Sequence, residues 1–200
     1  MKKKIITLFI LFFIILAGIL SYQKIKSKRY NEKYNISLHA KNLSEIISNW
    51  NQNDDSFTVR AVQKISKTDT AIAFVNVNNI DEGFCKLEEG MNHKFQIKSC
   101  TYGSVEKNNW FRSRKIKTNK GNYGVFEGEN AYGKIKSIIV SKKQFTSESN
   151  IQENENVKLI VPQKSFFYLF KKIEKNTPIK DYYNVAYLDQ NGKSINYFIH

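Results

Sequence analysis

The two cysteines of the chain, Cys85 and Cys100, are the side chains whose chemistry depends most on where the protein resides. Each lies in a segment that alternates like a β-strand, and Gly90 to Asn92 lies near the midpoint between them. A hairpin that turns there places the two thiols on neighbouring strands, within reach of a disulfide if the register agrees. The crosslink would close about sixteen residues and stabilise the domain by about 3 kcal/mol in the chain-entropy model. We therefore predict a structural disulfide.

Two unrelated buried thiols and a redox pair are the alternatives to this disulfide. A redox pair usually has the spacing Cys-x-x-Cys, which the chain lacks. The prediction also requires a domain outside the cytoplasm, because cytosolic reductants keep thiols reduced.

A second candidate for chemistry is the segment from Trp110 to Lys120, where aromatic and basic side chains are concentrated. Such a segment can bind an anionic polymer or a partner through charge and ring stacking. Its alternation instead makes both faces of a strand largely polar, as in an exposed or edge strand whose charges prevent edge-to-edge pairing. We favour the edge strand and keep as candidate contacts Trp110, Phe111, Arg112, Arg114, Lys115, Lys117 and Lys120.

Motifs for metal binding and catalysis are absent from the sequence. The three histidines, His39, His93 and His200, have no partner at the spacing of a zinc site. The chain has no Gly-x-Ser-x-Gly, no phosphate-binding glycine loop and no His-Glu-x-x-His. We therefore predict no metal, no cofactor and no catalytic residue, while carboxylates that meet only in the fold remain open. Four of the 32 basic residues are arginines, the side chain suited to bidentate phosphate and base contacts, so nucleic acid is not an expected partner.

The element that places these residues is the segment from Ile5 to Leu20, sixteen residues with no charge and no amide. As a helix it is about 24 Å long, against a hydrocarbon core of about 30 Å. Ser21 and Tyr22 can extend it, and flanking lysines can reach the headgroups. We predict an uncleaved single-span anchor. A secretory signal cleaved after the poor site Ile19-Leu20-Ser21 and a buried soluble helix are the alternatives.

Basic residues flank this segment on both sides and carry half of the formal charge of +14. The positive-inside count therefore does not favour an outside C-terminus. The layout of an export signal and the cysteine pair both indicate the opposite, so we predict an inside N-terminus and an extracytoplasmic domain. The membrane-flanking residues are Lys2, Lys3, Lys4, Lys24, Lys26, Lys28 and Arg29.

The domain organisation follows from these segments: an anchor at 1–21, a basic juxtamembrane tether at 22–35 that can also continue the helix, and one domain at 36–200. Apolar residues from Ile36 to Trp50 recur at three- and four-residue spacing, which predicts a helix over 36–51. Period-two segments then follow to the C-terminus, separated by glycines. We predict a mainly β fold: the transmembrane helix, the short amphipathic helix, then a many-stranded antiparallel meander, sandwich or small barrel.

Three local features of the β part carry specific predictions. Asn191-Gly192 predicts a two-residue type I′ hairpin between 185–189 and 193–199. The run Phe166–Phe170 predicts a strand buried on both faces. Glu127 and Glu129 flank Gly128 as in a tight turn, and 146–156 reads as a long acidic loop.

The lysine-led span, the short helix and the β-rich domain with Thr118-Asn-Lys-Gly-x-Tyr123 and Leu188-Asp-Gln-Asn-Gly-Lys193 resemble uncharacterised single-pass membrane-anchored proteins of low-GC Gram-positive bacteria. The resemblance implies location and fold class, and it brings no activity with it. Minor pilins share the span, helix and β domain, but their span carries a glutamate near its start, which this chain lacks.

Three classes of function are considered from the sequence. The first is a membrane-tethered extracytoplasmic binding or structural protein that contacts the lipid bilayer and an envelope polymer or a membrane protein. The second is a cell-envelope enzyme of the hydrolase type, with a site that only the fold assembles. A cytoplasm-facing nucleic-acid-binding protein is the third class, and it would require reduced thiols and strong salt dependence.

Overall fold

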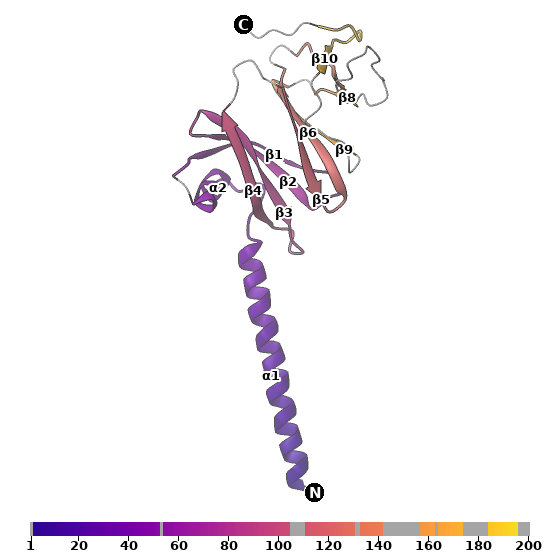
Figure 1. The fold of residues 1–200 in the computed structure, drawn as a ribbon. Coiled ribbons are helices and arrows are strands. Elements are labelled where there is room, and N and C mark those ends of the chain that lie inside the picture. The colour runs from indigo at the N-terminus through magenta and orange to yellow at the C-terminus, as the bar shows by residue number, and fades with distance from the viewer. Residues whose placement is uncertain are drawn as a thin grey trace, which may run out of the picture. The chain divides into compact units, whose positions relative to one another are not determined.

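The chain folds into antiparallel β-sheets with two helices, in a computed structural model that describes residues 2–52, 54–104, 111–130, 133–141, 157–162, 164–173 and 184–195 (Figure 1). The predicted mainly β fold is confirmed. The chain divides into two compact units, each with its own core. Unit 1 comprises residues 1–62 and 71–103, and unit 2 comprises residues 63–70 and 104–200.

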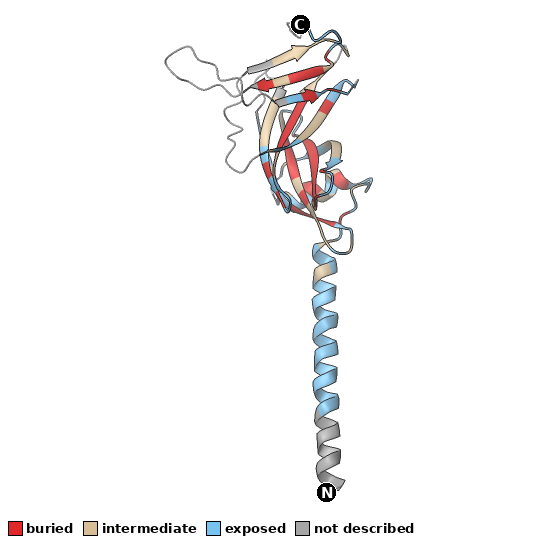
Figure 2. Ribbon diagram, turned by 90° about the vertical axis from the view of Figure 1, so that its right-hand side faces the viewer, coloured by how far each residue is buried: buried red, intermediate tan, exposed pale blue. Residues whose placement is uncertain are grey.

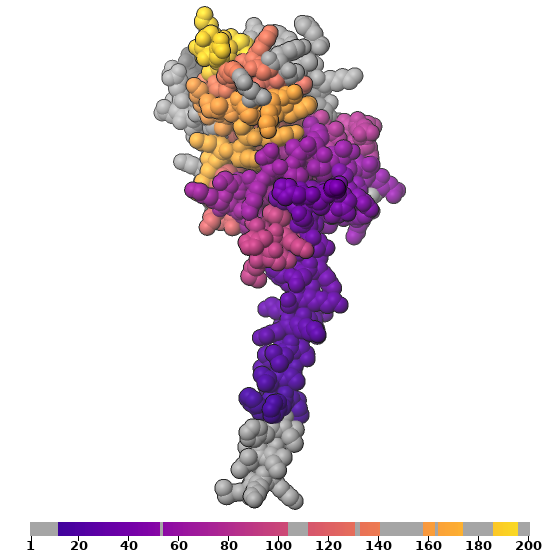
Figure 3. Space-filling model, turned by 180° about the vertical axis from the view of Figure 1, so that it is seen from behind, coloured from indigo at the N-terminus to yellow at the C-terminus, as the bar shows by residue number. Residues whose placement is uncertain are grey.

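Helix α1 runs from Lys2 to Lys33 without a break, so the apolar segment and the basic stretch after it form one helix. Its side chains are described from Phe12 onward, and they are exposed as far as Arg29 (Figures 2 and 3). Within the described part of the chain, no helix combines the length and the hydropathy that crossing a membrane requires.

Helix α2 spans Leu43–Asn51, seven residues shorter at its start than the predicted helix over 36–51. The prediction for residues 36–42 is wrong because Ile36 forms a β-bridge with Phe95. The Ile36 N–H donates to the Phe95 carbonyl at 3.0 Å, and the Phe95 N–H donates back at 2.8 Å. The apolar side chain of Ile36 is therefore buried beside the edge strand β4, and its spacing from the next apolar residues matched a helix face by coincidence.

Unit 1 is built on one four-stranded sheet in the order β1-β2-β3-β4, with α2 packed on it (Figure 1). The strands are β1 (Phe57–Lys64), β2 (Thr70–Val77), β3 (Asp81–Glu89) and β4 (Phe95–Ser104). Alternate residues of β2 face the helix, as the period-two pattern predicts. The buried core of this face consists of Ile36, Leu43, Ile47, Phe57, Ala71, Ala73, Val75, Val77, Cys85, Leu87, Phe95 and Ile97.

Two serines of α2 satisfy backbone groups of β1, which is an edge strand of this sheet. The Phe57 N–H donates to Ser48 Oγ at 2.9 Å, and the Val59 N–H donates to Ser44 Oγ at 3.0 Å. Ser48 Oγ in turn donates to the Ser44 carbonyl at 3.0 Å. An edge strand whose N–H groups are paired in this way offers less template for pairing with another chain.

The opposite edge strand, β4, changes its inward face part-way along. Phe95 and Ile97 belong to the unit 1 core, and further along Cys100 and Tyr102 pack against the same core. Residues on one face of a regular strand are two apart, so this change from odd to even positions indicates a β-bulge near Lys98. A bulge twists the strand and disfavours edge-to-edge pairing.

Unit 2 contains two open three-stranded sheets that pack on a shared core. One has the order β5-β6-β9, with β5 (Phe111–Thr118), β6 (Gly121–Glu129) and β9 (Phe166–Ile173). The other has the order β10-β7-β8, with β7 (Ser137–Ser141), β8 (Val157–Ile160) and β10 (Asn184–Leu188). Neither sheet closes on itself, so the small-barrel alternative is wrong. The core between them consists of Phe126, Ile135, Ile138, Val140, Leu159, Val161 and Phe167.

Two local predictions in unit 2 need correction, and a third is not tested. Glu127 and Gly128 lie inside β6 rather than in a tight turn. The first residue of β9, Phe166, is 48% exposed, so this strand is not buried on both faces, although Phe167 is buried. Residues 146–156, the predicted acidic loop, lie outside the described residues.

The turn after β10 has three residues rather than two. Gly192 has φ +74°, whereas Asn191 is not among the residues with positive φ, which excludes type I′. The Asp189 N–H donates to the Lys193 carbonyl at 3.0 Å, which closes the loop. The Asp189 carboxylate also accepts from the N–H groups of Asn191 and Lys193 at 2.8 and 2.9 Å. This carboxylate therefore selects the longer loop. Beyond the bridge between Leu188 and Ser194, the strand predicted at 193–199 is not described past residue 195.

Replacing both Ser44 and Ser48 by alanine is expected to destabilise unit 1 by about 1–3 kcal/mol, because the N–H groups of Phe57 and Val59 lose their acceptors. Chemical denaturation of the full chain in detergent measures the loss, and hydrogen exchange should locate it at those two amides. The control is Ser99→Ala on the exposed side of β4. Equal stability of the double variant and the control would contradict this role.

Candidate functional site

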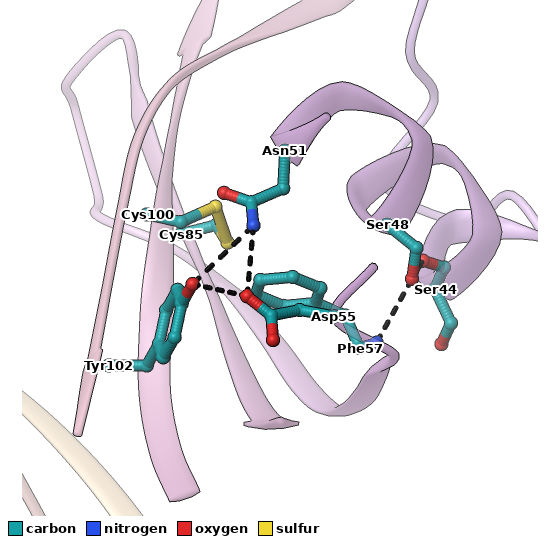
Figure 4. Close-up of a disulfide and its surroundings, with 8 residues drawn as sticks. All are labelled: Ser44, Ser48, Asn51, Asp55, Phe57, Cys85, Cys100 and Tyr102. Atoms are coloured by element: carbon teal, nitrogen blue, oxygen red, sulfur yellow. Dashed lines mark hydrogen bonds between the residues drawn. A yellow bond between two sulfur atoms is a disulfide. The ribbon is translucent and has the colours of Figure 1, made fainter. Parts of the chain in front are cut away.

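The two cysteines join β3 to β4, the neighbouring strands on which the sequence placed them (Figure 4). Their sulfur atoms are 2.00 Å apart and their Cα atoms 4.0 Å apart. Cys85 is fully buried and Cys100 is half-buried. Gly83 allows the strands to approach here, since a Cβ atom on it would lie 2.6 Å from Tyr102 Cα. The crosslink is therefore part of the core of unit 1.

A polar cluster beside the disulfide ties the end of α2 to β4 (Figure 4). The Tyr102 hydroxyl donates to Asp55 Oδ2 at 2.6 Å, and its ring meets the Phe57 ring edge-on with centroids 5.4 Å apart. Asn51 Nδ2 lies 3.4 Å from both Asp55 Oδ2 and the Tyr102 oxygen. Asn78 Nδ2 donates to Asp55 Oδ1 at 2.8 Å. Both carboxylate oxygens are thus engaged in holding α2, β1 and β4 together.

The C-terminal end of α1 is attached to the hairpin between β3 and β4, in what we call the helix junction: Tyr30, Asn31 and Tyr34 against Glu88, Gly90, Met91, Asn92 and Gln96. The Met91 N–H donates to the Tyr30 hydroxyl oxygen at 2.5 Å. Asn92 Nδ2 donates to Asn31 Oδ1 at 3.2 Å and to the Tyr34 carbonyl at 2.9 Å. The rings of Tyr30 and Tyr34 stack with centroids 4.7 Å apart.

Glu88 is the charged centre of the helix junction. Its Oε1 accepts from Tyr34 Oη, Gln96 Nε2 and Lys98 Nζ, each at 3.1 Å. Burial raises the pKa of Glu88, but the hydrogen bonds from Lys98, Tyr34 and Gln96 and the charge of Lys98 outweigh it and lower the pKa below its ordinary value. The carboxylate is therefore the form that holds Tyr34 in place.

Gly90 leaves the space that the Tyr30 hydroxyl and the Tyr34 ring occupy. A Cβ atom at this position would lie 2.5 Å from the Tyr30 hydroxyl oxygen and 2.6 Å from a ring carbon of Tyr34. The sequence suggested only a turn at Gly90, and it assigned Tyr30 and Tyr34 to a tether. The missed signal is the pair of tyrosines four residues apart, on one face of a helix.

The candidate polymer-binding segment is divided between a buried face and an exposed face of β5. Arg112 and Arg114 share their side of the strand with buried Ile116 and Thr118. Arg112, whose side chain is 17% exposed, lies 3.7 Å from buried Glu127, its register partner on β6. Burial lowers the pKa of Arg114, partly offset by the charge of Glu127, while the charge of Arg112 lowers it further. Of the two predicted forms, an exposed or an edge strand, the structure shows the edge strand, and the face that carries Arg112 and Arg114 is largely buried.

The other face of the segment carries its exposed charge. Lys115 and Lys117 alternate with the arginines and are exposed, and Lys120 is exposed in the turn to β6. Trp110 lies outside the described residues, and so does the side chain of Phe111. The structure therefore separates two arginines that belong to the fold from three lysines that face solvent.

The histidines are not brought together. His39 is exposed, His93 Nδ1 lies 3.2 Å from Glu89 Oε1, and His200 lies outside the described residues. Among the residues that the structure describes, no group of three His, Cys, Asp or Glu side chains could hold a metal ion. A shallow hollow lies on α1, lined by Lys24, Ser27, Lys28, Asn31, Glu32 and Asn35.

Comparison of the chain with family models, curated proteins and solved structures gives no match. The inferences that follow therefore depend on the geometry of the chain itself.

Replacing Gly90 by alanine is expected to displace Tyr30 and Tyr34 and to destabilise the helix junction by about 1–3 kcal/mol, the usual cost of overpacking. Hydrogen exchange at the Met91 amide should become faster. The control is Gly103→Ala, because a Cβ atom there meets nothing within 4 Å. If the two variants leave the Met91 amide equally protected, the tyrosines do not depend on the space left by Gly90.

Acid is expected to open the helix junction. The pKa of Glu88 is lowered in the folded chain, so its carboxylate stabilises the fold above the ordinary glutamate range. That contribution is lost as the pH falls through the lowered pKa. Protection of the Met91 amide measured against pH should show this loss, and Glu88→Gln should remove the pH dependence. Glu45→Gln, an exposed change in α2, serves as the control and should keep the wild-type profile.

Proposed function

We propose that the protein is a membrane-tethered, extracytoplasmic binding or structural protein whose N-terminal helix is an uncleaved anchor. The observation that carries the proposal is the surface of α1. Large apolar side chains are exposed there at consecutive positions from Phe12 to Leu16 and again at Ile19 and Leu20. Consecutive positions point to every side of a helix, so no single packed partner face accounts for them. A lipid bilayer covers all sides of such a helix at once.

The cysteine pair supports an extracytoplasmic location of the domain. Disulfides persist in oxidising compartments and are rare in the cytosol. Cys85 is fully buried, and the crosslink belongs to the core that supports both α2 and the hairpin at the helix junction. A protein whose core includes a disulfide is best suited to an extracytoplasmic location.

The exposed lysines of unit 2 support a binding role. The side chains on or beside this edge strand that face solvent are Lys115, Lys117 and Lys120. Their positive charge would attract an anionic envelope polymer. Lysine is a flexible point charge rather than a rigid fork, so such contacts favour a repeated anionic polymer over one precise ligand.

The test combines fractionation with thiol labelling of intact cells. The chain should stay with the membrane after an alkaline carbonate wash, at full length from residue 1. A membrane-impermeant thiol reagent should label Cys100, the half-buried partner of Cys85, only after a reductant is added. Labelling that needs cell lysis but no reductant would falsify the extracytoplasmic placement. If the mature chain begins beyond residue 21 and is released from the membrane, the proposal of an uncleaved anchor is refuted.

A further inference from the structure

The hollow on α1 joins polar side chains of one helix face into a single site. Lys24, Ser27, Lys28 and Asn31 recur at three- and four-residue spacing, and with Glu32 and Asn35 they line a shallow hollow of about 720 Å³ that is largely open to solvent. Two ammonium groups, a hydroxyl and an amide thus lie on one face within about two turns of helix. This donor set suits a phosphate ester, with positive charge and neutral hydrogen-bond donors together.

The position of the hollow along the helix matches one part of a bilayer. Lys24 lies four residues after Leu20, about 6 Å further along the helix axis. The headgroup region extends about 5–7 Å beyond the hydrocarbon core on each side. Helix side chains lean toward the N-terminus, so Lys28 is directed back toward the same level. If Leu20 marks the end of the span, the hollow lies at the headgroups.

The helix junction fixes which way this face points. Asn92 Nδ2 donates to Asn31 Oδ1 at 3.2 Å, so the amide of Asn31 is held with its carbonyl toward the hairpin and its NH2 group available as a donor. Lys28 makes a contact of 3.9 Å with Glu32, but both side chains are more than half exposed and such a pair contributes little. Among the described residues, a phosphate at Lys24 and Lys28 has this weak ion pair to displace.

We propose that this hollow binds the phosphate of an anionic phospholipid headgroup, with Lys24 and Lys28 as the charged contacts and Ser27 and Asn31 as neutral donors. The proposal rests on the membrane tethering proposed above. It goes further, because it assigns the lipid contact to one face of α1 rather than to the sum of the basic residues around the span.

A matched pair of variants tests this assignment. Lys24→Ala with Lys28→Ala removes two charges from the hollow, and Lys26→Ala with Arg29→Ala removes two charges from the opposite side of the helix. All four positions are exposed and alanine favours a helix, so both variants should remain folded. Native mass spectrometry of the full chain in neutral detergent then counts bound phosphatidylglycerol against phosphatidylcholine.

One phosphatidylglycerol is expected to bind per wild-type chain, at least tenfold tighter than phosphatidylcholine. The affinity for phosphatidylglycerol should fall at least tenfold in the Lys24/Lys28 variant and less than threefold in the Lys26/Arg29 variant. Equal losses in the two variants would overturn the site in favour of general surface charge. Displacement of the lipid by millimolar inorganic phosphate would overturn the assignment to a lipid headgroup. A wild-type chain that stays with the membrane yet shows no lipid preference refutes this inference alone, whereas a chain released from the membrane refutes the tethering.

Discussion

The contact on which the attachment of α1 to unit 1 depends is the close approach of Tyr30 and Tyr34, whose rings stack on each other, to Gly90. The polar bonds around it all use the hydroxyl groups of these two tyrosines: Tyr34 to Glu88, Gln96 to Tyr34, and Met91 to Tyr30. A glycine is needed because any side chain at position 90 would occupy the volume of the rings. One small residue therefore decides whether α1 is fixed to the sheet or merely precedes it.

The disulfide acts on the same hairpin from its other end. Cys85 and Cys100 join β3 to β4, and the residues that hold α1 lie between them, from Glu88 to Gln96. A crosslink restricts mainly the unfolded chain, and it keeps the two strands adjacent even when local contacts open. The covalent bond and the aromatic stack therefore stabilise opposite ends of one supersecondary element.

Sequence reasoning predicted what periodicity and composition control, and it missed what tertiary contacts control. Most strands, the cysteine pairing and the edge position of β5 follow from alternation and turn residues. Ile36 was assigned to the helix because it lies four residues before Ala40, the spacing of one helix face. It is apolar for another reason, since it is buried beside the edge strand β4. Arg112 was predicted to be a surface contact because a local pattern does not reveal its ion-pair partner. That partner is Glu127, fifteen residues away on the next strand. The Asn191-Gly192 turn was lengthened by the carboxylate of Asp189, a side-chain effect that backbone preferences do not include.

The candidate site was the hardest part to predict because it also depends on tertiary contacts that periodicity and composition do not reveal. Residues 22–33 have the composition of a tether, and a flexible chain of that length has a mean span of about 20 Å with no fixed direction. As a helix, the same twelve residues extend about 18 Å in one fixed direction. The reach is similar, but only the helix keeps Lys24 and Lys28 on one face and Lys26 and Arg29 on another. The proposed face-specific recognition of a lipid therefore depends on α1 continuing as a helix as far as Lys33, because in a flexible tether the basic residues would act only as a diffuse charge.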